Sequence, residues 1–184
     1  MKLPLTEETT LAQIRRALAS DDPAERAEAI DALGILRDER GLADALSHDD
    51  AYVRRRAVRS LADVPGERHT WRLAHMIFDP DADVRGDVVH ALGRRGGIGG
   101  WLVAHALRRV VEQDEASGVR YLALTTLDEL DASNAVAVLH EAHATDPESL
   151  VRETARALLL RRGIDPGPAS GGSGGLTGSE GVES

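Results

Sequence analysis

Apolar side chains recur at every third or fourth position along most of this chain, a spacing that places them on one side of an α-helix. The segment from 50 to 62 is the clearest example, because Val53, Ala57 and Leu61 fall on one side of the helix it predicts. Asp-Pro pairs and glycine-rich stretches interrupt the pattern. Each interruption predicts the end of one helix and the start of another. The pattern as a whole predicts an all-α protein.

One short unit is repeated along the chain. It reads Asp50-Ala-Tyr-Val-Arg-Arg-Arg-Ala-Val-Arg-Ser-Leu-Ala62, and further copies begin at Asp81, Val119 and Glu148, with a degenerate copy at Asp22. The arginines that follow the same position of each unit are Arg26, Arg54, Arg85, Arg120 and Arg152. They are 28, 31, 35 and 32 residues apart, which is the period of a helical solenoid. The sequence therefore predicts an α-solenoid of about five helical hairpins.

The composition changes abruptly after Ile164. Residues 165–184 contain seven glycines and few side chains that a core could bury, so ordering this segment is not offset by burial. We expect one solenoid domain over residues 1–164 and a flexible, disordered Gly/Ser-rich tail over residues 165–184. Within the domain, the glycines between 93 and 100 predict the loosest joint.

The repeated arginines lie at the edge of the apolar stripe, where an unpaired charge is costly. Carboxylates recur four residues before them, at Asp22, Asp50, Asp81 and Glu148. We expect a ladder in which each arginine reaches an acid or a loop carbonyl of its own or the neighbouring repeat. The arginines predicted to have this structural role are Arg26, Arg54, Arg85, Arg120 and Arg152.

The tandem motif Asp-x-x-Val-Arg-x-x-Ala-x-x-x-Leu resembles the HEAT-repeat family, and it is most similar to the short bacterial type that also occurs in phycobilin lyases. The resemblance covers about residues 6–162. It implies an α-solenoid, and it implies one of several roles that the family has: scaffolds, adaptors, a few lyases and some DNA-binding enzymes.

The second helix of each hairpin normally lines the concave side of such solenoids, and its outward positions predict a binding surface. The basic, polar and aromatic residues at these positions lie in the middle three repeats. Together they suit an acidic or phosphorylated peptide segment. The predicted partner-binding residues are Arg55, Arg56, Arg59, His90 and Tyr121.

The composition of the chain excludes several kinds of site and partner. The chain has no Cys, which excludes thiolate metal sites and cysteine nucleophiles. A net charge of −9 makes nucleic-acid binding unlikely, because a negative surface repels phosphates. No segment is apolar enough to span a membrane, and no secretory signal is recognisable, so we expect a cytoplasmic protein.

Histidines and tryptophans are the remaining candidates for chemistry. His140 and His143, with Glu141 and Asp146 nearby, have the spacing of metal ligands, but no second ligand pair accompanies them. We interpret them as a surface pair and expect no metal site. The two tryptophans lie in apolar stripes and are expected to be core residues.

The sequence supports three functional hypotheses. The leading one is a non-enzymatic scaffold or adaptor that binds a protein or peptide partner through the concave face, with no catalytic residue and no cofactor. The first alternative is a lyase-type enzyme, or a subunit of one, that handles a small molecule or prosthetic group in the concave groove. The second alternative is a HEAT-like protein that binds nucleic acid.

Overall fold

The computed structural model describes residues 7–96, 100–132 and 134–168 of the chain, and these residues form ten α-helices and one 3₁₀-helix. The first member of each hairpin is an odd-numbered helix: α1 (Glu7–Ala17), α3 (Glu39–Ala45), α5 (Glu67–His75) followed by η1 (Met76–Phe78), α7 (Gly100–Gln113) and α9 (Ala135–Thr145). The second member is an even-numbered helix: α2 (Pro23–Ile35), α4 (Ala51–Ala62), α6 (Ala82–Arg94), α8 (Ser117–Glu129) and α10 (Ser149–Arg161).

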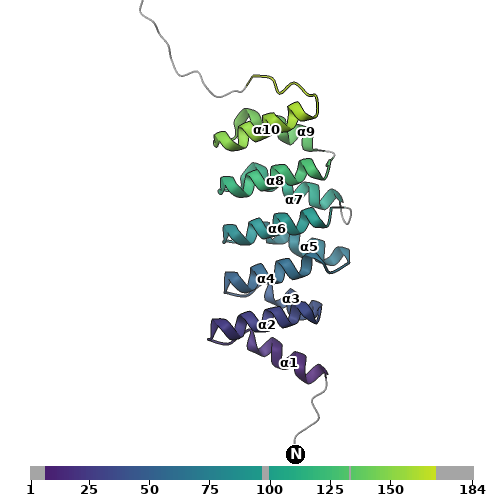
Figure 1. Cartoon of the computed structure of the whole chain (residues 1–184), viewed down its shortest axis with the longest axis vertical. Coiled ribbons are helices and arrows are strands. Elements are labelled where there is room, and N and C mark those ends of the chain that lie inside the picture. The colour runs from purple at the N-terminus through teal and green to yellow at the C-terminus, as the bar shows by residue number, and fades with distance from the viewer. Residues whose placement is uncertain (1–6, 97–99, 133, 169–184) are drawn as a thin grey trace, which may run out of the picture.

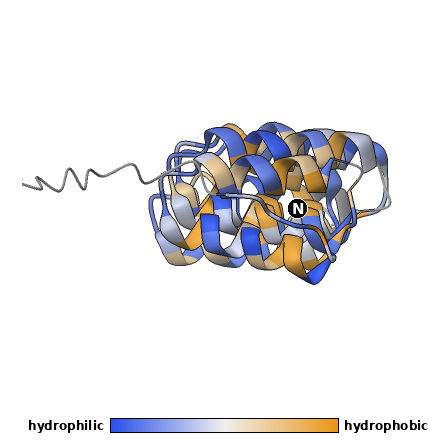
Figure 2. Ribbon diagram, turned by 90° about the horizontal axis from the view of Figure 1, so that it is seen from above, coloured by the Kyte–Doolittle hydropathy of each residue, from blue (hydrophilic) through white to orange (hydrophobic). Residues whose placement is uncertain are grey.

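The helices form two rows along one elongated array (Figure 1). The even-numbered helices pack on one another in succession from α2 to α10, and each odd-numbered helix packs against a neighbouring even-numbered one. Viewed along the array, the two rows appear as two layers in which apolar and polar residues alternate around each helix (Figure 2). The prediction of an all-α solenoid built from five hairpins is confirmed.

Side-chain caps explain where the even-numbered helices begin. Asp22, Asp50 and Asp81 are the N-cap residues of α2, α4 and α6, and each carboxylate accepts a hydrogen bond from the backbone N–H two residues later. This satisfies a donor that the first helical turn leaves free. Pro23 follows the first of these caps, where its missing N–H costs nothing.

The core is one continuous cluster of Leu, Val, Ile and Ala side chains that runs between the two rows. Each even-numbered helix supplies the residues that the repeated unit predicts: Val53, Ala57 and Leu61 of α4, for example, have no exposed surface. A hairpin of this composition buries its stripe only against its neighbours, so the repeats depend on one another for stability. No helix in the described part of the chain is both long enough and apolar enough to cross a membrane.

The prediction that residues 93–100 form a loose joint is wrong for the N-terminal part of this segment. Gly93 belongs to α6, and a Cβ there would lie 2.8 Å from the side-chain methyl of Thr126, so this glycine permits close packing of α6 on α8. Arg95 is 4% exposed and donates to the hydroxyl of Thr70, to two carbonyls at the end of α4 and to two carbonyls of the loop that follows. These bonds hold the end of α6 in place. Residues 97–99, like 169–184 of the predicted tail, lie outside the described residues.

The prediction that both tryptophans belong to the core is also wrong. Trp71 is 59% exposed and Trp101 is 74% exposed. In α5 the buried stripe includes His69 and Thr70, followed by Leu73. Because these polar residues occupy inward positions, the tryptophan between Thr70 and Leu73 in the helical sequence points outward.

Candidate functional site

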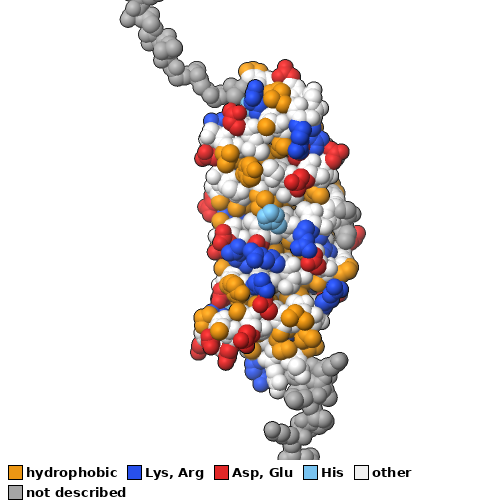
Figure 3. Space-filling view, in the orientation of Figure 1, with side chains coloured by type: hydrophobic (Ala, Val, Ile, Leu, Met, Phe, Trp, Pro, Cys, Tyr) orange, Lys and Arg blue, Asp and Glu red, His pale blue; other side chains and the backbone are white. Residues whose placement is uncertain are grey.

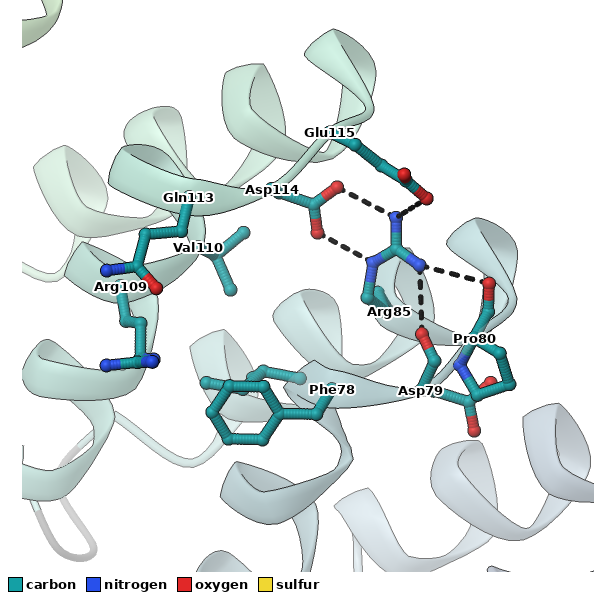
Figure 4. Close-up of a pocket in the computed structure, with 10 residues that line it drawn as sticks. Phe78, Asp79, Pro80, Arg85, Arg109, Val110, Gln113, Asp114 and Glu115 are labelled. Carbon is teal, nitrogen blue, oxygen red and sulfur yellow. Dashed lines mark hydrogen bonds and ion pairs between the residues drawn. The ribbon is translucent and has the colours of Figure 1, made fainter.

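The repeated arginines form a regular set of contacts along one edge of the array. Arg85 shows the pattern: its Nε and Nη2 donate to the two carboxylate oxygens of Asp114 at 2.7 and 2.9 Å (Figure 4). Its Nη1 donates to the carbonyls of Asp79 and Pro80, which precede its own helix. Arg54 contacts Asp79 in the same way, and Arg120 contacts Asp146. Each of these arginines therefore links its own loop to the next repeat.

The carboxylates in these contacts are mostly not the ones that sequence spacing indicates. The acids four residues before the arginines cap the helices, whereas the partners Asp79, Asp114 and Asp146 lie two residues before the helix caps of the following repeat. Each partner also accepts a hydrogen bond from the backbone N–H two residues later. The partner acid thus fixes the shape of its own loop as well as pairing with an arginine.

The two ends of the set differ from its centre. His48 occupies the partner position in the second repeat, so Arg26 donates to the cap residue Asp50 instead, at 2.6 and 3.0 Å. Arg152 in α10 donates only to the carbonyls of Asp146 and Pro147, as far as the described residues extend. The contacts are strongest in the interior of the array.

The charges in these pairs stabilise one another. Hydrogen bonding to the facing carboxylates raises the pKa of Arg54, Arg85 and Arg120 above the ordinary value, despite the opposing effect of burial. Burial on its own favours the protonated form of Asp146, but hydrogen bonds from Arg120 and from the Glu148 N–H outweigh it and lower the pKa of the carboxyl. The pair is fully ionised at neutral pH.

The predicted partner-binding arginines on α4 are already paired within the protein. Arg55 and Arg59 both donate to Asp87 of α6, at 2.7 Å from the first and 2.9 and 3.0 Å from the second. Arg56 donates to Asp31 of α2. These bonds cross from one even-numbered helix to the next, so the three arginines also help to hold the row together.

His90 and Tyr121 lie on the same row as these arginines but do not share their contacts. His90 is exposed on α6, and Tyr121 is 37% exposed on α8. Neither residue lines the groove described next. The predicted five-residue patch therefore remains a prediction, and only part of it lines this groove.

A groove of about 520 Å³ lies at the C-terminal ends of α2, α4 and α6, and it contains two of the predicted arginines. Lys and Arg side chains gather over this part of the even-numbered row (Figure 3). Ile35, which is 82% exposed, adds apolar surface beside them. The residues that line the groove are Asp31, Gly34, Ile35, Arg37, Arg56, Arg59, Ser60, Asp63, Val64 and Arg94.

The groove is positively charged although the chain as a whole is negative. Four arginines line it against two aspartates, and Arg59 also pairs with Asp87 outside the groove, which leaves an excess of one positive charge. Arg94 pairs with Asp63, and Arg56 pairs with Asp31. These ion pairs are partly exposed, so an incoming anion can exchange with the aspartates at small cost. The arrangement suits a ligand that carries carboxylates or other anionic groups.

Sequence reasoning missed Arg37 and Arg94, which complete the groove. Arg37 follows the end of α2 with a φ of 51°, a left-handed conformation that glycine normally occupies at this position. Gly163 occupies the corresponding position after α10. The only signal in the sequence is a basic residue close to a helix end, and such residues are common because they interact with the helix dipole.

The two histidines considered as metal ligands differ in how deeply they are buried. His143 is 4% exposed and its Nδ1 lies 3.3 Å from the carbonyl of Arg152, so the interpretation of a surface pair with His140 is wrong for this residue. Among the described residues, no group of three or more His, Cys, Asp or Glu side chains is arranged to hold a metal ion.

Comparisons with known proteins identify the repeat and the fold. Residues 39–100 match the family of HEAT repeats. No curated protein matches the chain. A chain in the complex of CpcE and CpcF of phycocyanin lyase from Nostoc is similar in structure, with a TM-score of 0.61, 20% identity, and 83% of this chain and 99% of that chain covered. An engineered protein is also similar, with a TM-score of 0.52, 18% identity, and 82% of this chain and 78% of that chain covered.

These findings confirm the resemblance to HEAT repeats and correct the leading functional hypothesis. The interpretation as a non-enzymatic scaffold or adaptor is contradicted by the similarity to a phycocyanin lyase chain along almost the whole length of that chain. At 20% identity the similarity itself establishes a common fold.

Proposed function

We propose that this chain, whose residues 39–100 match HEAT repeats, is a lyase-type enzyme, or a subunit of one, that holds a small anionic molecule or prosthetic group in the groove at the ends of α2, α4 and α6. The similarity in fold to a chain of the CpcE and CpcF complex is the observation that carries this proposal. That protein is a complex of two subunits, and we propose that this chain likewise acts together with a second protein.

The dimensions of the groove support a small-molecule ligand. A volume of about 520 Å³ lies within the range of roughly 300–1,000 Å³ that small-molecule sites have. Gly34 and Ser60 line it with small side chains, and Ile35 supplies apolar contact. A ligand with an extended apolar body and charged ends matches this combination of surfaces.

The arginines would bind and orient the anionic groups of the ligand. A guanidinium group offers donors in a planar fork that fits a carboxylate, and Arg37 follows the end of α2 whereas Arg94 is the last residue of α6. Asp31 and Asp63 would then be released from their ion pairs. In this proposal they are the groups available to accept a proton during the reaction.

Biliverdin, an open-chain tetrapyrrole with two carboxylates, is a suitable probe for the groove. We expect its absorption spectrum to change on titration with the protein. The double variant Arg37→Met/Arg94→Met should weaken binding about tenfold or more, because it removes two charge-assisted contacts. Arg16→Met is the matched control, since Arg16 is exposed on α1 and does not line the groove.

Two results decide the proposal. Equal binding of biliverdin by the double variant and by the wild type would place the ligand elsewhere on the molecule. No spectral change with any variant, together with a purified protein that carries no small molecule by native mass spectrometry, would contradict the prosthetic-group function itself.

A further inference from the structure

All the tryptophan and phenylalanine residues of the chain are exposed on the odd-numbered row. Trp71 lies on α5, Phe78 in η1 and Trp101 on α7, and they are 59%, 60% and 74% exposed. Large aromatic side chains normally contribute to a core, and they are enriched where proteins bind one another. We call the exposed side of α5, η1 and α7 the aromatic face.

Basic side chains are placed directly beside these rings. The guanidinium carbon of Arg109 lies 5.2 Å from the centre of the Phe78 ring, a cation–π geometry that joins α7 to η1. The ring of His75 contacts that of Phe78 edge to face, with the ring centres 6.2 Å apart. Trp101 stacks on His105 with ring centres 5.7 Å apart. Phe78 and Trp101 therefore have ring contacts within the protein before any partner arrives.

A hollow of about 320 Å³ opens beside Phe78, between η1 and α7. Ile77, Phe78 and Val110 provide its apolar lining, and Arg109 and Gln113 lie along one side of it (Figure 4). On its opposite side, Asp79 and Asp114 pair with Arg54 and Arg85, and the exposed Glu115 lies 3.5 Å from Arg85. The hollow thus combines an apolar lining with hydrogen-bond donors from the side chains of α7.

The charge of the aromatic face is opposite to that of the whole protein. Its three helical elements contain four arginines, at positions 68, 72, 108 and 109, against Glu67 and Glu112, whereas the net charge of the chain is −9. Arg68 pairs with Glu39 of α3, and Arg108 pairs with Glu112. Among the described residues, Arg72 and Arg109 are the arginines of these elements that have no carboxylate partner. The contrast in charge favours an acidic partner by charge complementarity. It also disfavours a second copy of this chain, since two copies of an acidic protein repel each other on average.

We propose that the aromatic face is a docking surface for an acidic segment of a second protein. In this complex an apolar side chain of the partner occupies the hollow beside Phe78, and a flanking carboxylate contacts Arg109. Trp, Phe and Arg are the residue types that most often dominate the energy of such an interface. The surface belongs to the odd-numbered row, so the proposal does not depend on what the groove at α2, α4 and α6 binds.

A random peptide library of about 12 residues provides the probe for this surface. The library is displayed on phage and selected on the full-length protein, with the soluble variant Phe78→Ser/Arg109→Glu present as a competitor. We expect the enriched peptides to contain acidic residues around an aromatic or aliphatic one. A synthetic copy should shift the tryptophan emission to shorter wavelength, because both tryptophans of the chain lie on this face.

The variants test whether the binding site is the one proposed. Phe78→Ser/Arg109→Glu should weaken the peptide about tenfold or more, and added salt should weaken it further. Arg40→Glu, which removes an exposed arginine from α3, should bind as the wild type does. Melting curves should coincide for all three proteins, because the changed side chains are exposed.

Several outcomes would overturn the proposal. Enrichment of basic peptides, no enrichment, or equal binding by the double variant would show that this face does not recognise an acidic segment. Tighter binding of a single-stranded oligo(dT) of about 20 nucleotides, lost in the same variant, would make it a nucleic-acid surface instead. Sedimentation that shows a wild-type dimer broken by the variant would assign the face to a second copy of the chain.

Discussion

Four arginines of α4 behave in two different ways. Arg54 is 9% exposed, reaches both oxygens of Asp79 and donates to two carbonyls of the preceding loop. Arg55, Arg56 and Arg59 lie more toward solvent and each depends on carboxylates of neighbouring helices alone. The first kind of contact fixes the repeat, and the second leaves side chains that a ligand can redirect. Position on the helix, and not residue type, makes this difference.

Removal of a buried arginine should have the largest effect. Arg120→Met leaves Asp146, whose side chain is 4% exposed, without its guanidinium partner. We expect a loss of about 3–5 kcal/mol in the free energy of unfolding, because a buried carboxylate is left unpaired. Urea denaturation measures this loss. Arg108→Met, which removes an exposed pair with Glu112, should have a far smaller effect because solvent screens that pair. Similar losses for both variants would contradict the distinction between buried and exposed pairs.

The two arginines that share Asp87 offer a second test. Arg55→Met and Arg59→Met should each cost less than about 1 kcal/mol, since the remaining arginine still pairs with the carboxylate. The double variant removes both partners of a residue that is 9% exposed. It should therefore lose roughly 1–2 kcal/mol more than the sum of the single variants. Strict additivity in denaturation measurements would show that the two contacts are independent.

Arg152 should be intermediate between the two kinds. It retains the two carbonyl contacts of the interior arginines, but it has no described carboxylate partner. Arg152→Met should cost about 1 kcal/mol, well below the loss from Arg120→Met, because only neutral acceptors lose a donor. A loss as large as that of Arg120→Met would mean that the carbonyl contacts, and not the carboxylate, carry the energy.

Mild acidification should produce a small effect, in which His69 responds before the carboxylates. Burial, with the charges of Arg68, Arg72 and Arg95, lowers the pKa of His69 in the folded protein. As the pH falls below about 6.5, the unfolded chain takes up this proton first, so stability decreases. His69→Gln should reduce the change in melting temperature between pH 7 and pH 5 by roughly the contribution of one titrating group.

Carboxylates of the repeat contacts should respond only in stronger acid. The pKa values of Asp50 and Asp146 are lowered in the folded state, so their stabilising charge is present above the ordinary value of about 4 and is lost as the pH falls through the folded values. A steep loss of helicity by circular dichroism is therefore expected below about pH 4. Loss of the whole transition near pH 6 would contradict this order.

The repeat unit was enough to predict the fold, because Val53, Ala57 and Leu61 have a helical spacing that only a stacked array can bury. It also indicated that Arg54 and its equivalents need partners. The partners could not be identified, because Asp79 is 25 residues from Arg54 and its position depends on where the next loop lies. Local spacing favoured the nearer acids, which cap helices instead.

The sequence predicted only some of the residues that line the groove. Arg56 and Arg59 lie on the outward side of α4, as their spacing predicts, but the ends of three helices must meet before Arg37 and Arg94 complete the site. The aromatic face was missed for a different reason. Trp71 looks like a core residue in an apolar stripe until Thr70 and His69 are found to occupy the inward positions.

The bidentate contact between one repeat and the next has a direction: the donor belongs to the earlier unit and the acceptor to the loop of the later one. Any single unit therefore carries half of two different pairs. Duplication of such a unit in the gene would add one complete new pair at the junction and leave none of the existing ones broken. Growth of the protein by whole units is thus electrostatically self-consistent, whereas a deletion that begins or ends inside a unit strands a buried charge.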